Sequence, residues 1–413
     1  MNNLKKQTPR GALDIIPKDC YIKNETESAI RNVFSGFGYF EVQTPAFEFY
    51  DVFSNEDVCE LIKFIDKSGN ILALRHDITT PIARMAATKL AGEPLPMRLS
   101  YVGTAFRDGD AHAGALQREF TQAGIELIGE NSSEADAEVI AAAVKAIRAA
   151  GLEEFQIEIG HADFFRSLAA QINLNESDTE ELRKLIDNKS LVGINELISG
   201  GSAPEPVKQL ILQLPNMFGG IEVIDGIDKT VLNETAVAAL CNLREVYDIL
   251  VDYGLEKYIA VDLGMVRQLN YYTGIITKGY ARGIGFPICG GGRYDNLVAE
   301  FGRDIPATGM AIGIERLISA LRCTDKLFLK PCVNTVVCYT DFRKEAFAVA
   351  EALRESGLSV EMLWGGNPVE YAKLRGIAGI VEIKNENDVQ IVNTITEECV
   401  NADISDFLGG EPK

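Results

Sequence analysis

The sequence is poor in the residues from which metal and redox centres are commonly built. Its 413 residues include three histidines, far apart, and eight cysteines, none of them in a C-x-x-C pair. Structural zinc sites need closely spaced Cys and His ligands, so a metal centre is not expected. We expect the scattered cysteines to be reduced and to pack as small buried apolar residues.

Long apolar stretches are also missing. No run reaches the roughly 18 apolar residues that predict a membrane-spanning helix. The first residues, MNNLKKQTPRGALDIIP, lack the apolar segment and the small-residue cleavage site of a signal peptide. The sequence therefore predicts a cytoplasmic protein without membrane contact.

Positive charge is scarce. The chain has 40 Lys and Arg residues against 60 Asp and Glu residues, a formal net charge of −20. Nucleic-acid-binding proteins normally carry a clustered basic face, so a nucleic-acid partner is not favoured. The hydrophobic content of 46% is that of ordinary globular cores, and the length allows two to four domains of roughly 100–200 residues.

Helix and strand patterns are mixed in the first 160 residues. Apolar spacing predicts helices at 20–36 and 132–151, strands at 39–45, 97–107, 119–129 and 155–160, and a hairpin at 63–75. A further helix begins near Thr79, with Thr80 as N-cap and Pro81 at the first helical position. In the helix at 132–151, Ser133 and Asp136 resemble a capping box and Gly151 supplies the stop.

The middle of the chain is predicted to be helical. Residues 162–255 read as an inserted helical subdomain, broken by glycine and proline pairs. Strands return at 258–264, 271–280 and 285–292, followed by a helix at 313–322. This order predicts an α+β domain with a largely antiparallel sheet over residues 1–325.

The C-terminal part has a different pattern. Residues 326–331 form a candidate linker, and 332–413 alternate strand and helix as in a small α/β domain. This domain has seven basic and fourteen acidic residues, a net charge of 7 − 14 = −7. Since an RNA-binding domain must neutralise phosphates, this acidic domain is a poor RNA binder.

Polar residues recur along the predicted strands. Asp77 and Thr79 stand at a strand end, Arg107 ends another strand, and Gln122 and Glu126 share one face of a third with Gly124. Further along the chain, Arg267, Tyr271 and Tyr272 are likewise polar residues at or just before the start of a predicted strand. On composition alone the strand face of Gln122 is more often solvated than the floor of a pocket. As a set, these groups suit an amino-acid ligand.

The run Gly290–Gly292 has neither the spacing nor the Lys-Ser/Thr ending of a phosphate-binding loop. We interpret these glycines as strand positions that another backbone or a ligand approaches closely.

Six ordered motifs resemble a known family. They are the strand ending at Pro45, LRHDITTPIAR (74–84), YVGTAFR…REFTQAGIELIG (101–129), RQLNYYTG (267–274), GGGRYDNLV (290–298) and GMAIGIERL (309–317). In this order they are similar to histidyl-tRNA synthetases and to their non-synthetase relatives, the regulatory subunits of ATP phosphoribosyltransferase. The resemblance covers residues 8–322 and reaches the C-terminal domain only weakly.

The resemblance implies a fold and an assembly. The fold is α+β, a class II aminoacyl-tRNA synthetase-like antiparallel sheet core with a helical insertion, plus a small C-terminal α/β domain that is a degenerate form of an anticodon-binding domain. Self-association into a dimer through the first helix and the strand ending at Pro45 is also implied.

Three departures favour the regulatory relatives over the synthetases. The D-x-T-T-P-I-A-R form around Asp77 is similar to the regulatory subunits. The loop 108–112 lacks the His-Glu-Arg series with which synthetases hold ATP. The signature at 267–272 retains Arg267 and both tyrosines but replaces the family's glycine and aspartate with Gln268 and Asn270.

The regulatory interpretation implies a histidine site and a partner. The implied site residues are Asp77, Thr79 and Gln122 for the ammonium group, Glu126 and Tyr272 for the imidazole ring, Arg107 and Arg267 for the carboxylate, and Tyr271 in the same set. Arg316 matches an ATP-contacting arginine of the family. The implied partner is the short-form catalytic ATP phosphoribosyltransferase subunit, with histidine as effector and no cofactor. The alternative is a working histidyl-tRNA synthetase; a hydrolase or metalloenzyme has no supporting residue pattern.

Overall fold

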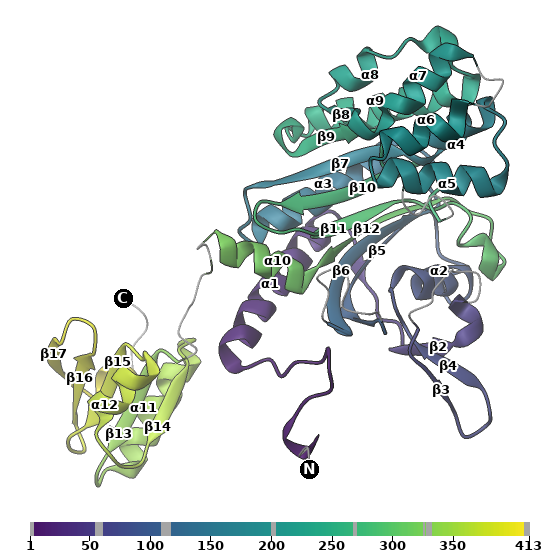
Figure 1. Cartoon of the computed structure of the whole chain (residues 1–413). Coiled ribbons are helices and arrows are strands. Elements are labelled where there is room, and N and C mark those ends of the chain that lie inside the picture. Colours follow the sequence, from purple (N-terminus) through teal and green to yellow (C-terminus); the bar gives the residue numbers. More distant parts are fainter. Residues whose placement is uncertain are drawn as a thin grey trace. The chain divides into compact units, whose positions relative to one another are not determined.

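The computed structural model describes residues 4–53, 61–108, 117–199, 204–266, 271–324, 327 and 333–408. The chain divides into two compact units, Met1–Leu327 and Phe328–Lys413 (Figure 1). Across the described ranges, no helix is both long and apolar enough to cross a membrane.

A nine-stranded sheet is the centre of the first unit. Its strand order is β1-β5-β6-β12-β11-β10-β7-β9-β8, and all pairs are antiparallel except β1 with β5 and β7 with β9. The strands are β1 (Phe40–Glu41), β5 (Met97–Phe106), β6 (Glu119–Ile128), β7 (Phe155–His161), β8 (Phe218–Gly219), β9 (Ile259–Asp262), β10 (Ile275–Ala281), β11 (Cys289–Arg293) and β12 (Ala307–Gly313). The largely antiparallel sheet expected from the sequence is confirmed.

The two faces of this sheet are covered differently. Helices α1 (Pro17–Gly36), α3 (Ser133–Ala149) and α10 (Ile314–Cys323) pack on one face, where β6 contributes Ala123, Ile125 and Leu127 to the main apolar core. The other face meets the short helix α2 (Thr79–Ala87) in a smaller cluster that includes Tyr101 and Ile128. Because strand residues alternate, Gln122, Gly124 and Glu126 lie on the α2 side.

Helices dominate residues 162–255, as the sequence predicted. They are α4 (Ala162–Gln171), α5 (Glu176–Asp187), α6 (Leu191–Ser199), α7 (Glu205–Gln213), α8 (Glu222–Asp225) and α9 (Glu234–Asp252), and they lie beyond β7 and β9 in Figure 1. Helices α4 and α9 share the main apolar core with α3.

A small three-stranded sheet, β2-β4-β3, stands beside α2. Its strands are β2 (Phe47–Phe49), β3 (Lys63–Ile65) and β4 (Ile71–Leu74). The predicted hairpin is confirmed: the Asp66 carboxylate accepts the amide hydrogens of Ser68 and Asn70, both at 2.8 Å, and Gly69 has φ +86°. The turn therefore needs a residue that tolerates positive φ.

The second unit has its own five-stranded sheet, ordered β14-β13-β15-β16-β17, with two separate apolar clusters. Its elements are β13 (Thr335–Tyr339), α11 (Arg343–Glu355), β14 (Val360–Leu363), α12 (Pro368–Arg375), β15 (Gly379–Ile383), β16 (Asp388–Asn393), β17 (Cys399–Asp403) and α13 (Ser405–Leu408).

Several local predictions are wrong. The strand expected to reach Pro45 has only Phe40 and Glu41 paired in β1, and the strand β12 was not predicted because its glycines and alanines carry little strand signal. The cap of α3 is Ser132, whose hydroxyl accepts the amide hydrogen of Ala135. Ser133 is not the cap, because its hydroxyl donates to Glu245.

Two further expectations need correction. Helix α2 starts at Thr79, so Thr80 and Pro81 lie within its first turn and do not begin it. Of the described cysteines only Cys289 and Cys338 are buried, while Cys241, Cys323 and Cys399 are exposed.

Candidate functional site

Glu126 is the central group of the site on the α2 face of the sheet. Its side chain is 1% exposed, it accepts a hydrogen bond from the Thr79 hydroxyl at 2.7 Å, and it accepts a second, short one from the Tyr294 hydroxyl. The solvated strand face favoured by composition is therefore wrong at Glu126. The carboxylate is held by donors from α2 and from the segment after β11.

Small residues on neighbouring strands make room for these large groups. Glu126 pairs in register with Gly309 of β12, and a Cβ on Gly309 would overlap the Glu126 carboxylate. Gly124 likewise leaves space for the ring of Tyr101, its register partner on β5. Gly291 approaches the backbone of Gly309 so closely that no side chain fits, which confirms the interpretation of the glycine run.

Burial changes the acidity of Glu126. Desolvation raises the pKa of this carboxyl to about 8, and the nearby Asp77 charge adds to the rise, while the hydrogen bonds from Tyr294 and Thr79 oppose it. Near neutral pH the free protein therefore holds Glu126 partly protonated. A ligand N–H aimed at this group would stabilise its carboxylate form.

Asp77 lies at the start of α2. Its carboxylate accepts the amide hydrogen of Thr80 at 2.7 Å, which ties it to the first turn of the helix, and Nε2 of His76 lies 3.1 Å from its second oxygen. His76 in turn packs edge-on against Phe53, with ring centroids 5.0 Å apart. Asp77 is thus an oriented carboxylate near Glu126.

Three tyrosines form an aromatic wall. The rings of Tyr271 and Tyr272 meet edge to face at 4.9 Å, and Tyr271 lies 5.7 Å from Tyr294. Burial raises the pKa of the Tyr272 hydroxyl, and the charges of Glu126 and Asp77 raise it further, so Tyr272 is neutral. The wall offers aromatic surface and hydroxyl groups next to Glu126.

Two arginines lie together at the other end of the same face. The Arg107 guanidinium lies 5.2 Å from the Phe120 ring, and Arg316 donates to the Pro287 carbonyl oxygen at 2.9 Å. Burial lowers the pKa of Arg316 and the neighbouring Arg107 charge lowers it further. Neither forms an ion pair with a carboxylate in the described ranges. They can receive an anionic group.

The amide of Gln122 is half-buried between these two ends. Its Oε1 is enclosed and accepts no hydrogen bond from the part of the chain that is described. Buried acceptors normally have a donor, and this oxygen is free to accept an N–H group. Arg267, the other predicted carboxylate partner, lies outside the described residues.

The structure adds Tyr294, Tyr101 and Gly309 to the residues predicted from sequence. The alternation of the GGGRYD motif offered a signal for Tyr294, because Arg293 and Tyr294 must face opposite sides of the sheet. For Tyr101 and Gly309 the signal appears only once strands β5, β6 and β12 are paired.

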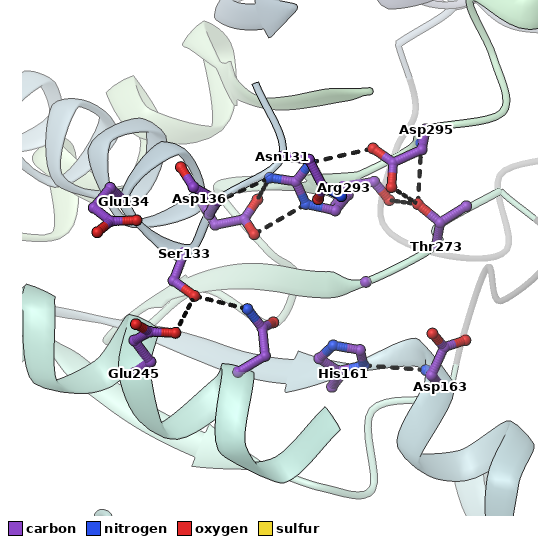
Figure 2. A pocket seen from close by; sticks show the side chains of 13 residues that line it. Asn131, Ser133, Glu134, Asp136, His161, Asp163, Glu245, Thr273, Arg293 and Asp295 are labelled. Carbon is purple, nitrogen blue, oxygen red and sulfur yellow. Dashed lines mark hydrogen bonds and ion pairs between the residues drawn. The ribbon is translucent and has the colours of Figure 1, made fainter. Parts of the chain in front are cut away.

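A polar pocket of about 520 Å³ lies among α3, β7, α9 and the end of β11. Arg293 pairs there with Asp136, Nη2 to Oδ1 at 3.0 Å, and with Asp295 at 3.1 Å (Figure 2). Burial lowers the pKa of His161 to about 4, so this lining histidine is neutral. No group of three or more metal-ligating side chains occurs within the described segments.

Comparison with known families and proteins identifies the relatives of this chain. The family profile described as histidyl-tRNA synthetase matches residues 11–317. The ATP phosphoribosyltransferase regulatory subunit of Acetivibrio thermocellus is 47% identical over 417 residues, covering 99% of this chain and 100% of the relative. That of Ruminiclostridium cellulolyticum is 42% identical, covering 96% and 98%.

Solved structures give the same fold. A Bacillus halodurans protein titled ATP phosphoribosyltransferase regulatory subunit/histidyl-tRNA synthetase has a TM-score of 0.81 at 31% identity, covering 91% of this chain and 97% of that chain. Histidyl-tRNA synthetase from Nostoc has a TM-score of 0.83 at 23% identity, covering 97% of both chains. The class II synthetase-like fold expected from the sequence is confirmed.

Proposed function

Since the chain belongs to the family of ATP phosphoribosyltransferase regulatory subunits, built on the histidyl-tRNA synthetase fold, we propose that its Glu126 site binds free histidine and that the occupied site controls the catalytic subunit. The chain is a regulatory subunit and does not itself carry out the transferase reaction. The short catalytic subunit needs it for activity and is inhibited by histidine through it.

The buried Glu126 carboxylate carries this proposal. Among common metabolites with an amino acid's charges, histidine also offers an imidazole N–H for a carboxylate enclosed by aromatic rings. We assign the imidazole to Glu126 and Tyr272, with Tyr271 and Tyr294 beside it. The remaining roles are Asp77, Thr79 and Gln122 for the ammonium group and Arg107 and Arg267 for the carboxylate.

Calorimetry tests the site directly. Histidine should bind the full chain, and Gln122→Ala and Glu126→Gln should each weaken binding at least about tenfold, the cost of one charged hydrogen bond. Glu119→Gln, at the exposed start of the same strand, serves as a matched control. Equal binding by all four proteins would remove the site from the proposal.

The proposal also excludes amino-acid activation. We expect no histidine-dependent pyrophosphate exchange, because the loop at 108–112 lacks the synthetase's nucleotide contacts even though Arg316 is retained. Exchange at a synthetase-like rate would restore the alternative of a histidyl-tRNA synthetase. The acidic second unit is consistent with a cytoplasmic protein that does not bind tRNA.

Exposed apolar side chains support self-association. Large apolar residues of β1 and the small sheet are between 40% and 77% exposed: Phe40, Phe47, Phe49, Phe64, Ile65 and Ile71. We assign this apolar surface to a symmetric dimer, as surfaces of this kind mark protein interfaces. The catalytic subunit then docks elsewhere on the chain.

Co-purification tests the partnership. The short catalytic subunit should form a stable mixed oligomer with this chain, and phosphoribosyl-ATP formation should need both proteins and fall when histidine is added. A catalytic subunit that is equally active and equally histidine-sensitive alone would contradict the proposal.

A further inference from the structure

The polar pocket of about 520 Å³ lies on the opposite side of the β11 segment from Glu126. Residue alternation makes this explicit: Tyr294 donates to Glu126, while Arg293 and Asp295 on either side of it line the pocket. The volume falls within the roughly 300–1,000 Å³ typical of small-molecule sites. The pocket is therefore separate from the proposed histidine site.

The lining residues come from five chain segments of the first unit. They range from an exposed rim to a buried floor. Asn131, Glu134 and Glu245 form the exposed rim, and Ser133, Asp136, Gly274 and Arg293 form the buried floor. Figure 2 shows Glu134, Asp136 and Glu245 approaching the space from α3 and α9. A wall assembled from so many segments is a built cavity, and it does not depend on a single helix end.

Charge decides which ligands the pocket accepts. Five carboxylates line it: Glu134, Asp136, Asp163, Glu245 and Asp295. Arg293 is the single lining cation of the described pocket, since burial keeps His161 neutral. A phosphate or carboxylate would meet net negative charge, whereas an ammonium group would find both carboxylates and neutral acceptors.

A metal ion fits the lining poorly. Asp136 and Asp295 are already paired with Arg293, Asp163 lies 2.9 Å from Arg166, and Glu245 accepts from Ser133 at 2.7 Å. No cluster of three metal-ligating groups is found among the described residues. The carboxylates are separated by hydroxyl and amide groups. This spacing suits a ligand whose N–H groups are several bonds apart from one another.

We propose that this pocket binds a small organic polycation, of the diamine or polyamine class, with its ammonium groups directed at the rim carboxylates Glu134 and Glu245. Ser132, Thr273 and the rim amide of Asn131 accept the remaining N–H groups. This assignment concerns a site distinct from the histidine pocket and does not need that pocket to be correct.

Three short connections link the two sites. Arg293 and Tyr294 are adjacent in the chain, and so are the pocket residue Thr273 and the wall residue Tyr272. Arg166 is the third connection between the polar pocket and the histidine site: it pairs with Asp163 of the pocket and donates to the Tyr272 carbonyl oxygen at 2.7 Å. A polycation bound in the pocket places positive charge near Arg293 and Arg166 and therefore alters these contacts. Resting on the proposed histidine site, we add that polycation and histidine binding are coupled.

The binding experiment uses the full chain and spermidine as probe, titrated calorimetrically without histidine. Glu134→Gln and Glu245→Gln, both exposed, should together weaken binding at least about tenfold. Asp248→Asn is the matched control, since Asp248 lies on α9 outside the lining. Equal binding by all variants would show general attraction to an acidic chain and overturn the assignment, as would equal heat from Mg²⁺ at the same concentration.

The coupling experiment compares histidine affinity with and without saturating spermidine. The two affinities should differ by at least about fivefold, with the reciprocal change in spermidine affinity. Arg166→Met should reduce this factor without weakening spermidine binding, because it leaves Asp163 without its arginine partner. Unchanged histidine affinity would overturn the coupling, and absence of any histidine binding beside intact spermidine binding would contradict only the proposed function.

Discussion

At the scale of the residue, one buried carboxylate controls most of the site's chemistry. The Glu126 carboxylate accepts hydrogen bonds from Thr79 and Tyr294 and occupies the space that a side chain at Gly309 would fill. The surroundings therefore fit a carboxyl group on a side chain of this length. The cost of burying it appears as the raised pKa, which a bound N–H donor would reverse.

The first prediction concerns pH. Since the folded pKa of Glu126 is about 8 and its ordinary value is 4.5, the native state retains a proton that the unfolded state loses. This group's contribution to stability is thus complete below pH 4.5 and is lost as pH rises toward 8. Glu126→Gln has no ionisable group at this position and so does not lose this stability as pH rises. The melting temperature of the variant minus that of the wild type should therefore increase by about 2 °C or more between pH 5 and pH 9.

The Glu119→Gln variant provides the control, because Glu119 is an exposed carboxylate on the same strand. A melting-temperature difference for Glu126→Gln that stays constant over this pH range would contradict the raised pKa.

The second prediction concerns Gly309. Its Cβ position falls on the Glu126 carboxylate, so Gly309→Ala must displace that side chain. We expect histidine binding to be lost and the free energy of unfolding to fall by about 1–3 kcal/mol. Urea denaturation and calorimetry measure the two effects. Gly92→Ala, where no atom lies within 4 Å of the added Cβ, should change neither.

At the scale of the element, the edges of the nine-stranded sheet differ. The β1 edge carries Phe40, 77% exposed, near the apolar small sheet, while the far edge at β8 carries a single exposed aromatic, Phe218. Apolar side chains gathered on one edge favour an interface there.

The third prediction follows from this difference. Phe40→Lys combined with Phe64→Lys should place charges in the proposed dimer interface and raise the dimer dissociation constant at least about tenfold. Phe218→Lys, at the opposite edge, should leave the dimer intact. Sedimentation velocity over a concentration series distinguishes the outcomes, and a dimer that resists both changes would move the interface elsewhere.

At the scale of the whole molecule, each compact unit has its own apolar cores. All described residues of the proposed histidine site lie in the first unit. The second unit is therefore expected to contribute to assembly and not to effector binding.

The fourth prediction tests that division. A chain ending at Leu327 should bind histidine with the affinity of the full chain, within about twofold, because no described site residue is removed. Circular dichroism confirms folding, and calorimetry measures the affinity. A truncated chain that folds but fails to bind would assign part of the site to the second unit.

The sequence by itself determined the type of many local elements and suggested the polar residues of the proposed histidine site. Alternation along residues 118–129 and turn residues at 68–70 are local signals, so β6 and the hairpin were predictable. The ordered motifs likewise gave the family, because they record ancestry in the chain itself.

Only the tertiary structure decided which face of β6 is buried and what lies opposite each residue. Composition favoured a solvated face for Glu126, but pairing with β12 and coverage by α2 bury it, and neither neighbour is close in sequence. Strand β12 was missed for the same reason: Gly309 has no strand propensity and is required there because the Glu126 carboxylate occupies its side-chain space. Burial and register arise from long-range contacts, which no local pattern specifies.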